Sequence, residues 1–272
     1  MNDARSPTVR KVVLVTGGAR RIGRQIARAF AARGWNVALH YGSSADEAAI
    51  TVAELIALGV EASAFACDLS SETEVGALVP TVVGHFGQID AIVNNAAHFD
   101  YDDAHSFSAA TLQRHMLPNL MAPVMLARDL AAAVHARGPQ VRGVVINLLD
   151  QKLWNYNPDF LSYTLSKAAL EAATTMLAQA LAPAVRVLGV APGLTLISHL
   201  QTPQQFALTH AMAPLGHASK PEDIAQTVVF AAENSSMTGT TLVVDGGQHL
   251  VGFSRDFSMM NPSEGTPPSN TP

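Results

Sequence analysis

The sequence contains little charge, few aromatic residues and a single cysteine. Of its 272 residues, 14% are charged and 6% are aromatic, whereas 48% are hydrophobic. A charged fraction so far below the usual quarter indicates a large core and extensive subunit contacts. Cys67 has no second cysteine to pair with, so an internal disulfide is excluded. We therefore expect a reducing, cytoplasmic compartment.

Sequence signals for membranes, nucleic acids and metals are also missing. No apolar run reaches the roughly 18 residues that a membrane span needs, and the polar residues 1–10 lack the apolar stretch of a signal peptide. The net charge is −5 and no basic stripe is present, which argues against nucleic-acid binding. The ten histidines show no metal-ligand spacing. We expect no membrane, nucleic-acid or metal partner.

Apolar runs alternate with helical patterns along the chain. They predict seven strands, at residues 11–16, 36–41, 62–67, 90–95, 141–149, 185–191 and 240–245. This alternation is typical of an α/β Rossmann-type fold, a doubly wound parallel sheet with helices on both faces that binds ligands beyond the carboxyl ends of its strands. We expect a short extension (1–10), one catalytic domain (11–252) and a tail (253–272) that is mobile or ordered only by a neighbouring subunit.

A glycine-rich turn from Thr16 to Gly23 separates the first strand from a helix. Glycines let the backbone approach a pyrophosphate, and the helix N-terminus offers free N–H groups and a partial positive charge. The strand before and the helix after favour a phosphate-binding loop over an ordinary turn. Arg21 lies within the turn and offers five donors to a phosphate, although a plain surface arginine is the alternative.

The end of the second strand indicates which dinucleotide binds. NAD enzymes place an acidic residue there for the ribose 2′-hydroxyl. In this chain the strand ends at Tyr41, and no carboxylate follows before Asp46. Ser43 and Ser44 can donate to a 2′-phosphate, which an acid would repel. The sequence therefore favours NADPH over NADH.

Tyr163 and Lys167 stand four residues apart and share one helix face. A free phenol has a pKa of about 10, and a neighbouring cation pulls that pKa toward the working range. Asp150, thirteen residues before Tyr163, ends the fifth strand. Its carboxyl group can take up a proton and pass it on, or pair with the N–H groups of a heterocycle; capping a loop is the alternative. The pattern predicts a proton-donating site.

These motifs, together with Asp68, Asn95, Asn119 and the Pro-Gly pair at 192–193, resemble the short-chain dehydrogenase/reductase family over residues 9–250. The resemblance implies hydride transfer with a nicotinamide dinucleotide and a homotetramer, or less often a dimer. Arg21 replaces the middle glycine of the family's turn, and Asp150 replaces its serine. Both replacements are similar to the pteridine reductase branch.

The resemblance assigns roles to individual residues. The catalytic set would be Asp150, Tyr163, Lys167 and Asn119. The cofactor would contact Gly17, Arg21, Ile22, Gly23, His40, Tyr41, Gly42, Ser43, Ser44, Asp68, Leu69, Asn95, Ala96, Tyr163, Lys167, Pro192, Gly193 and Thr195. A pterin substrate would contact Arg21, Phe99, Asp150, Phe160, Tyr163 and Leu194.

Three of these assignments rest on further physical arguments. Pro118 should kink the helix that carries Asn119, and in the family the freed carbonyl holds a water of a proton relay; a kink made for packing alone is the alternative. Phe99 would stack a flat ring against the nicotinamide, or else be an ordinary wall of the pocket. Residues 194–213, including His199, read as a lid over the substrate.

The function implied is an NADPH-dependent pteridine reductase that transfers hydride to a dihydropterin or an oxidised pterin. Asp150 and Tyr163 would supply the proton, and Lys167 would hold the pKa of Tyr163 down. A reductase of a ketone or a 3-oxoacyl group is the alternative, which a serine at position 150 would have favoured. A non-catalytic NADP-binding sensor would be free to lose Tyr163 or Lys167. The sequence leaves open which pterin or folate is used, and whether the assembly is a tetramer or a dimer.

Overall fold

A seven-stranded parallel sheet forms the centre of the molecule. The computed structural model describes residues 10–198 and 201–260. Its strands run in the order β3-β2-β1-β4-β5-β6-β7, which confirms the predicted doubly wound topology. Their bounds differ by only one or two residues from those predicted, and they are β1 Val12–Val15, β2 Asn36–Tyr41, β3 Ala62–Ala66, β4 Ala91–Asn94, β5 Gly143–Leu148, β6 Val185–Pro192 and β7 Thr241–Val244.

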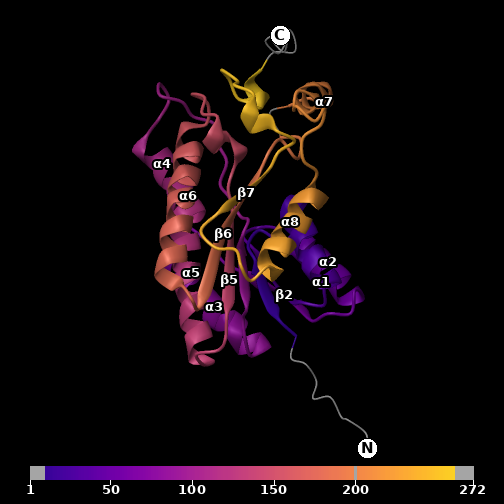
Figure 1. Ribbon diagram of the computed structural model, residues 1–272, viewed down its shortest axis with the longest axis vertical. Coiled ribbons are helices and arrows are strands. Elements are labelled where there is room, and N and C mark those ends of the chain that lie inside the picture. The colour runs from indigo at the N-terminus through magenta and orange to yellow at the C-terminus, as the bar shows by residue number, and fades with distance from the viewer. Residues whose placement is uncertain (1–9, 199–200, 261–272) are drawn as a thin grey trace, which may run out of the picture.

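Helices cover both faces of this sheet (Figure 1). One face carries α1 (Arg21–Ala32), α2 (Ala45–Ala57) and α8 (Pro221–Glu233), and the other carries α3 (Glu72–Phe86), α4 (Ala109–Met116), α5 (Ala122–Ala136) and α6 (Leu161–Leu181). Side chains alternate along β1, so that Val13 and Val15 pack toward α1 and α8, whereas Val12 and Leu14 pack toward α3 and α5. Strands buried on both faces need continuous apolar runs, which is the pattern that the sequence shows.

The long helix predicted for residues 111–137 is interrupted at Pro118. A π-helical turn, Leu117–Met121, joins α4 to α5, and the Ala122 N–H donates to Leu117 O, five residues back. Proline lacks the N–H that a regular helix would use, so the backbone widens there instead of continuing. The predicted interruption beside Asn119 is confirmed, and it is a π turn.

The stretch Ala109–Ala136 would be long and apolar enough to cross a membrane by length and composition alone. Half of its most apolar window is buried inside the protein, and α5 packs against α3, the sheet and α6. A core helix of a soluble protein passes the same test. We therefore interpret this stretch as a core helix of the α/β fold.

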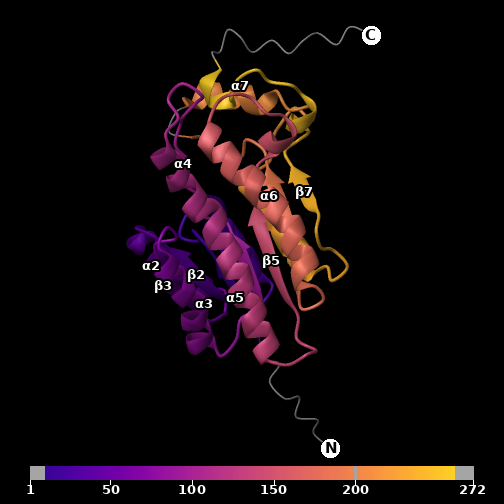
Figure 2. The ribbon, with the colours of Figure 1, turned by 90° about the vertical axis from the view of Figure 1, so that its left-hand side faces the viewer.

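The chain after β7 stays at the carboxyl edge of the sheet. Two short helical turns, η3 (Gln248–Leu250) and η4 (Phe257–Met259), follow β7. Both lie beyond the ends of the strands, where η4 packs against α7 (Pro203–Ala211) and η3 packs against the turn Gln151–Trp154 (Figures 1 and 2). Phe257 is buried. The described part of the expected tail, residues 253–260, thus packs on its own chain, whereas we expected it to be mobile or ordered by a neighbour.

Candidate active site

Two cavities adjoin at the carboxyl ends of the strands. The first, of about 930 Å³, is lined by the glycine turn and by residues that follow β2, β3 and β4. The second, of about 560 Å³, is lined by residues that follow β5 and β6 and by the C-terminal segment. Five residues, Arg20, Arg21, Ile22, Asn95 and Ala97, line both, so the cavities share a wall. This position agrees with the ligand site that the topology predicts.

The glycine turn is shaped to bring backbone close to a ligand. Gly17 has a φ of +60°, and a Cβ atom on Gly23 would overlap the carbonyl oxygen of Gly17, so neither position has room for a side chain. The free N–H groups at the start of α1 open toward the first cavity. The turn therefore fits the pyrophosphate of a dinucleotide, as the sequence predicted.

Arg21 occupies this turn in a left-handed conformation, with a φ of +53°. Such a backbone is unfavourable for a residue with a side chain, so the local fold holds Arg21 under strain. Its Nη2 donates to the Ile197 carbonyl oxygen over 3.0 Å. The guanidinium thus reaches from the turn to the segment that follows β6, and Arg21 lines both cavities.

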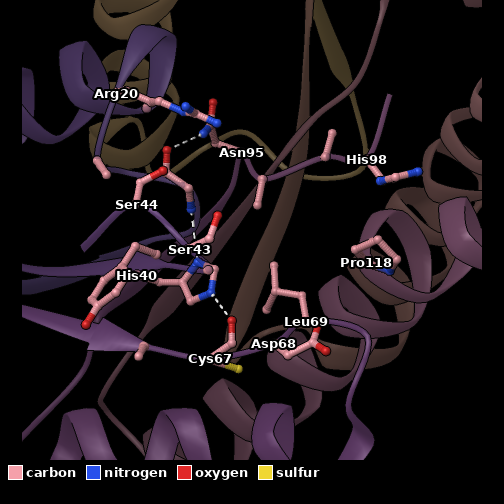
Figure 3. Close-up of a pocket in the computed structure, with 18 of the residues that line it drawn as sticks. Arg20, His40, Ser43, Ser44, Cys67, Asp68, Leu69, Asn95, His98 and Pro118 are labelled. Carbon is pink, nitrogen blue, oxygen red and sulfur yellow. Dashed lines mark hydrogen bonds between the residues drawn. The ribbon is translucent and has the colours of Figure 1, made fainter. Parts of the chain in front are cut away.

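His40 holds the turn in place from the end of β2. Its Nδ1 accepts a hydrogen bond from the Gly17 N–H (3.0 Å), and its Nε2 donates to the Cys67 carbonyl oxygen (3.0 Å; Figure 3). Burial lowers the pKa of His40, so the ring is neutral in this tautomer. We expected His40 to contact the cofactor. It lines the cavity, but both ring nitrogens bond to backbone, so it positions the loop and has no N–H left for a phosphate.

The glycine turn contributes a second arginine, Arg20, to the cavity wall near the residues that follow β2. Arg20 lines both cavities and forms no ion pair among the described residues, whereas Arg24 pairs with Glu54. Ser43 and Ser44 line the first cavity beside it, as do Tyr41 and Gly42 (Figure 3). Two hydroxyls and a guanidinium suit a 2′-phosphate. The only sequence signal for Arg20 was its place beside Arg21.

Four residues that follow β3 and β4 complete the first cavity. Asp68 and Leu69 line it after β3; Asp68 Oδ1 also accepts from the Ser70 N–H (2.9 Å), so this carboxylate caps a turn as well. The Asn95 amide donates to the carbonyl oxygens of Thr16 (2.9 Å) and Gly17 (3.1 Å). Asn95 therefore ties the glycine turn to the end of β4, and Ala96 lies directly after it in the same wall.

Asp150 and Tyr163 meet in the second cavity. The Tyr163 hydroxyl donates to Asp150 Oδ2 over 3.0 Å, while Asp150 Oδ1 accepts from the Lys152 N–H over 2.9 Å. Asp150 therefore caps the turn Gln151–Trp154 and faces the tyrosine at the same time. Part of its surface opens to the cavity, but the surrounding protein is deep enough that burial raises the pKa of Asp150.

The pKa of Tyr163 corrects one expectation. Burial raises it well above 10, and the charge of Asp150 and the hydrogen bond to it raise it further. Lys167 does not offset this, because its Nζ donates to the Leu148 carbonyl oxygen (2.6 Å) and lies 5.8 Å from the centre of the Tyr163 ring. Burial lowers the pKa of Lys167 itself to about 8. Tyr163 is thus held as a neutral phenol by its neighbours.

Tertiary contacts fix the start of α6 and with it Tyr163. Asp102 accepts a hydrogen bond from the Ser162 N–H over 2.9 Å, and its carbonyl oxygen accepts from the Leu161 N–H over 3.1 Å. These bonds satisfy N–H groups that a helix start leaves unpaired. Asp102 lies far away in the chain, and no sequence signal identified it.

Asn119 acts through the backbone of its neighbours. Its Oδ1 accepts from the His98 N–H (2.8 Å), and its Nδ2 donates to the His98 carbonyl oxygen (3.0 Å) and to Ser166 Oγ (3.0 Å). The side chain thereby links the π turn to the segment after β4 and to α6. It lines neither cavity, whereas Pro118 lines the first. A role for Asn119 in a proton relay stays a prediction.

Phe99 lies in the second cavity, and Phe160 lies behind it. Phe99 lines the second cavity, and its ring packs edge-on against Tyr163 at 4.7 Å. Phe160 is 1% exposed, lines neither cavity and stacks on Phe99 at 4.5 Å. The prediction that Phe160 contacts the substrate is therefore corrected, because its ring supports Phe99 from behind.

The segment that leaves β6 forms the opposite wall. Pro192, Gly193, Leu194 and Thr195 all line the second cavity. Leu194 N–H donates to Gln248 Oε1 over 2.8 Å, and a Cβ atom on Gly193 would overlap that oxygen. The predicted lid continues into α7; His199, expected to touch the substrate, lies outside the described residues.

Several cavity residues were not identified from the sequence. Gln151, Lys152 and Gln201 line the second cavity, as do three residues of the C-terminal segment, Asp256, Phe257 and Ser258. Lys152 offered a weak signal, because it stands two residues after Asp150. The described residues contain no group of three or more His, Cys, Asp or Glu side chains that could hold a metal ion.

Known proteins resemble this chain along most of its length. Residues 17–249 match a short-chain dehydrogenase family model described as enoyl-(acyl carrier protein) reductase. 3beta-hydroxysteroid dehydrogenase 1 of Eggerthella lenta is 34% identical over 88% of this chain and 94% of its own. The 3-oxoacyl-[acyl-carrier-protein] reductase FabG of Staphylococcus aureus is 32% identical over 88% of this chain and 98% of its own.

Two solved structures share both the fold and more of the sequence. FolM alternative dihydrofolate reductase 1 from Brucella canis, complexed with NADP, is 40% identical with a TM-score of 0.85, over 91% of this chain and 97% of that one. The Brucella suis protein of the same name, also in complex with NADP, is 39% identical with a TM-score of 0.82, over 89% and 96%. With the glycine turn, the Tyr163–Lys167 pair and the sheet order in place, these matches show that the chain belongs to the short-chain dehydrogenase/reductase family of oxidoreductases.

Proposed function

We propose that this protein is an NADPH-dependent reductase of the pteridine reductase type, which reduces a C=N bond of a dihydropterin or an oxidised pterin. The observation that carries the proposal is the hydrogen bond between Tyr163 and Asp150 in the substrate cavity. The similarity to two FolM alternative dihydrofolate reductases supports it.

NADP(H) is the cofactor in this proposal. The residues of the first cavity fit it, because Gly17 and Gly23 leave the backbone of the turn open to a pyrophosphate and Arg20 with Ser43 and Ser44 offers donors to a 2′-phosphate. The cofactor, when bound, supplies the hydride. Lys167 and the wall from Pro192 to Thr195 line the second cavity, which adjoins the first, and would position the nicotinamide end.

Proton delivery follows from the pair of residues in the second cavity. Hydride addition to the ring carbon leaves a negative charge on the adjacent nitrogen, which takes the Tyr163 hydroxyl proton. The tyrosine is then reprotonated by Asp150, whose raised pKa keeps a proton available at a higher pH than an ordinary carboxyl group would. Asp150 regains its proton from water that enters the cavity.

The cavity favours a flat, donor-rich ring over a simple ketone. Phe99, held rigidly by Phe160, gives an aromatic wall for stacking. Asp150 presents a carboxyl group and Gln151 an amide, and these suit the ring N–H and amino groups of a pterin. A serine at position 150 suits a single ketone oxygen, whereas the second carboxyl oxygen of Asp150 can also accept hydrogen bonds from ring N–H and amino groups.

A reductase of 3-oxoacyl groups or other ketones is the second candidate. The names of the Staphylococcus aureus and Eggerthella lenta relatives favour it, and Tyr163 with Lys167 would serve either reaction.

We further propose a homotetramer in the cytoplasm. Leu165 and Met176 on α6 are exposed apolar side chains that an interface would cover. Light scattering coupled to gel filtration measures the assembly.

One assay separates the two candidates. Purified protein is supplied with NADPH and, in turn, with dihydrobiopterin, dihydrofolate, a 3-oxoacyl thioester and simple ketones, and NADPH oxidation is followed. We expect turnover with a reduced pterin or folate and much slower turnover with the ketones. Turnover with the thioester or a ketone alone would overturn the pterin assignment. Tyr163→Phe should lower kcat on the best substrate by about 10²-fold or more, whereas Tyr156→Phe, which alters an exposed tyrosine, should not.

A further inference from the structure

The C-terminal segment forms part of the substrate cavity, although it lies a hundred residues along the chain from the catalytic pair. Asp256, Phe257 and Ser258 line the same cavity as Asp150 and Tyr163. The segment lies across the carboxyl ends of the strands, beside α7 (Figures 1 and 2). We call residues 253–258 the strap.

Two ion pairs fasten the strap to the loop between Asp150 and α6. Arg255 Nε lies 2.8 Å from Asp159 Oδ2, and Asp159 is 2% exposed. Lys152 Nζ lies 3.4 Å from Asp256 Oδ2, and Lys152 is also almost fully buried. The Asp256 N–H donates to the same Asp159 carboxylate over 2.7 Å. Charges buried to this degree are stable only with such partners, so both contacts hold the strap against the loop.

Apolar packing adds to these contacts. The Phe257 ring is buried and packs edge-on against Phe253 at 4.7 Å. The Phe257 carbonyl oxygen accepts from the Gln201 amide just before α7, and Asn155 donates to the Val251 carbonyl oxygen just before the strap. The strap thus joins the loop after β5 to the wall that leads into α7, and it closes the cavity between them.

Lys152 connects the strap to Asp150. Its backbone N–H bonds to Asp150 Oδ1, while its side chain pairs with Asp256. The other charged or titratable groups around Asp150 are Tyr163 and Lys167 from α6, and Arg20 and Arg21, which line the same cavity from the glycine turn and the start of α1. The Lys152–Asp256 pair is the part of this environment that depends on the strap.

We propose that the strap is a built-in cover of the substrate cavity, and that Lys152 and Asp256 are positioning residues whose opposite charges control the proton exchange of Asp150. The role of the two charges rests on the proposed function in one respect, the use of Asp150 as a proton carrier. The role of the strap as a cover does not depend on the proposed function.

The signs of the two charges make the proposal testable. The negative charge of Asp256 raises the pKa of Asp150 and of Tyr163, and the positive charge of Lys152 lowers the pKa of Asp150. Reduction needs the protonated carboxyl group, so activity should fall as pH rises through the pKa of Asp150. Asp256→Asn should move this alkaline limb of the kcat profile to lower pH, and Lys152→Met should move it to higher pH, each by at least about half a unit.

Opposite shifts separate a charge effect from a packing effect. Both substitutions break the same ion pair, so a merely structural role would change the profile in the same direction for both. The double variant Lys152→Met/Asp256→Asn should return the limb close to that of the wild type. Arg255→Met is the matched control, since it weakens the strap at its other ion pair without changing a charge next to Asp150. Shifts of the alkaline limb in the same direction in all three single variants would contradict the proposal that Lys152 and Asp256 control the proton exchange of Asp150.

A second measurement tests the cover without turnover. Hydrogen–deuterium exchange of residues 150–160 should rise in a chain that ends at residue 252 and stay unchanged in one that ends at residue 260. The shorter chain should also raise KM for the best substrate by about tenfold or more, because three residues that line the cavity are lost. Equal exchange of residues 150–160 in both truncated chains would contradict the proposal that the strap covers the cavity.

The pH profiles use whichever substrate the wild type reduces. Activity on a ketone and on no pterin would refute the proposed function and, with it, the charge role of Lys152 and Asp256, and would leave the exchange test of the cover valid. Activity on a pterin with an unchanged alkaline limb in every variant would refute only the charge role of Lys152 and Asp256, and the proposed function would stand. A failure of one proposal is therefore distinguishable from a failure of the other.

Discussion

Tyr163 donates its hydroxyl hydrogen to Asp150, with 3.0 Å between Tyr163 Oη and Asp150 Oδ2. The two side chains come from different elements, α6 and the turn after β5, and they meet in the substrate cavity. Both pKa values are raised, chiefly by burial. The pair therefore holds protons that ordinary aspartate and tyrosine side chains would release at lower pH, which suits a site that gives a proton to its substrate.

Replacing Asp150 tests this pair directly. Asp150→Ser should abolish dihydropterin reduction, because a hydroxyl group has too high a pKa to reprotonate Tyr163. The affinity for NADPH should stay within about threefold, since the groups around the nucleotide are unchanged. Steady-state NADPH oxidation and fluorescence titration of NADPH binding provide the two values. Full pterin activity in Asp150→Ser would contradict the proton route, and a gain of ketone reduction would favour the second candidate.

Cofactor choice should depend on Arg20. We expect kcat/KM to favour NADPH over NADH by at least about tenfold, because a charge-assisted contact is worth roughly 1.5–3 kcal/mol. Arg20→Gln should reduce that preference by lowering kcat/KM for NADPH alone. Arg33→Gln, an exposed arginine paired with Glu233, is the control and should leave the ratio unchanged. Equal use of both cofactors by the wild type would contradict the proposed 2′-phosphate site.

The stacked aromatic pair predicts a graded effect on substrate binding. Phe99→Ala should raise the pterin KM by about fivefold or more, since an aromatic contact contributes about 1 kcal/mol. Phe160→Ala should raise it less, because Phe160 only supports Phe99, and should lower the free energy of unfolding by about 3–5 kcal/mol. Phe107→Ala, at an exposed phenylalanine, is the control for both measurements. If Phe160→Ala raised KM more than Phe99→Ala, Phe160 would be the substrate contact.

The pKa of Lys167 makes stability depend on pH in a defined direction. Burial lowers this pKa to about 8 in the folded protein, whereas an unfolded lysine titrates near about 10.4. Between these values the unfolded chain keeps a proton that the folded chain has lost, so this group makes the free energy of unfolding rise with pH. The whole effect is at most about 3 kcal/mol.

Urea unfolding of the wild type and of Lys167→Met at pH 7 and pH 10 measures this effect. The variant lacks the titrating group, so its stability relative to the wild type should be higher at pH 7 than at pH 10. A constant difference between the two proteins at both pH values would show that Lys167 is not desolvated in the folded state.

Local patterns in the sequence determined much of the molecule. Seven apolar runs with turn signals between them were enough for the strands, because strands of a parallel sheet are buried on both faces and admit few polar residues. The glycine turn was recognisable because only glycine fits where the backbone packs against itself, as at Gly17 and Gly23. The spacing of Tyr163 and Lys167 placed both on one helix face.

Features that depend on burial or on residues distant in the sequence were decided only by the tertiary structure. Lys167 was expected to lower the pKa of Tyr163, but burial and Asp150 raise it, and burial cannot be read from a four-residue spacing. Phe160 was placed in the cavity wall, yet it lies behind Phe99. Asp256 gave no local signal at all. It reaches the cavity because the chain after β7 folds back over the sheet edge, and the pairing of Asp256 with Lys152 exists only in the folded chain.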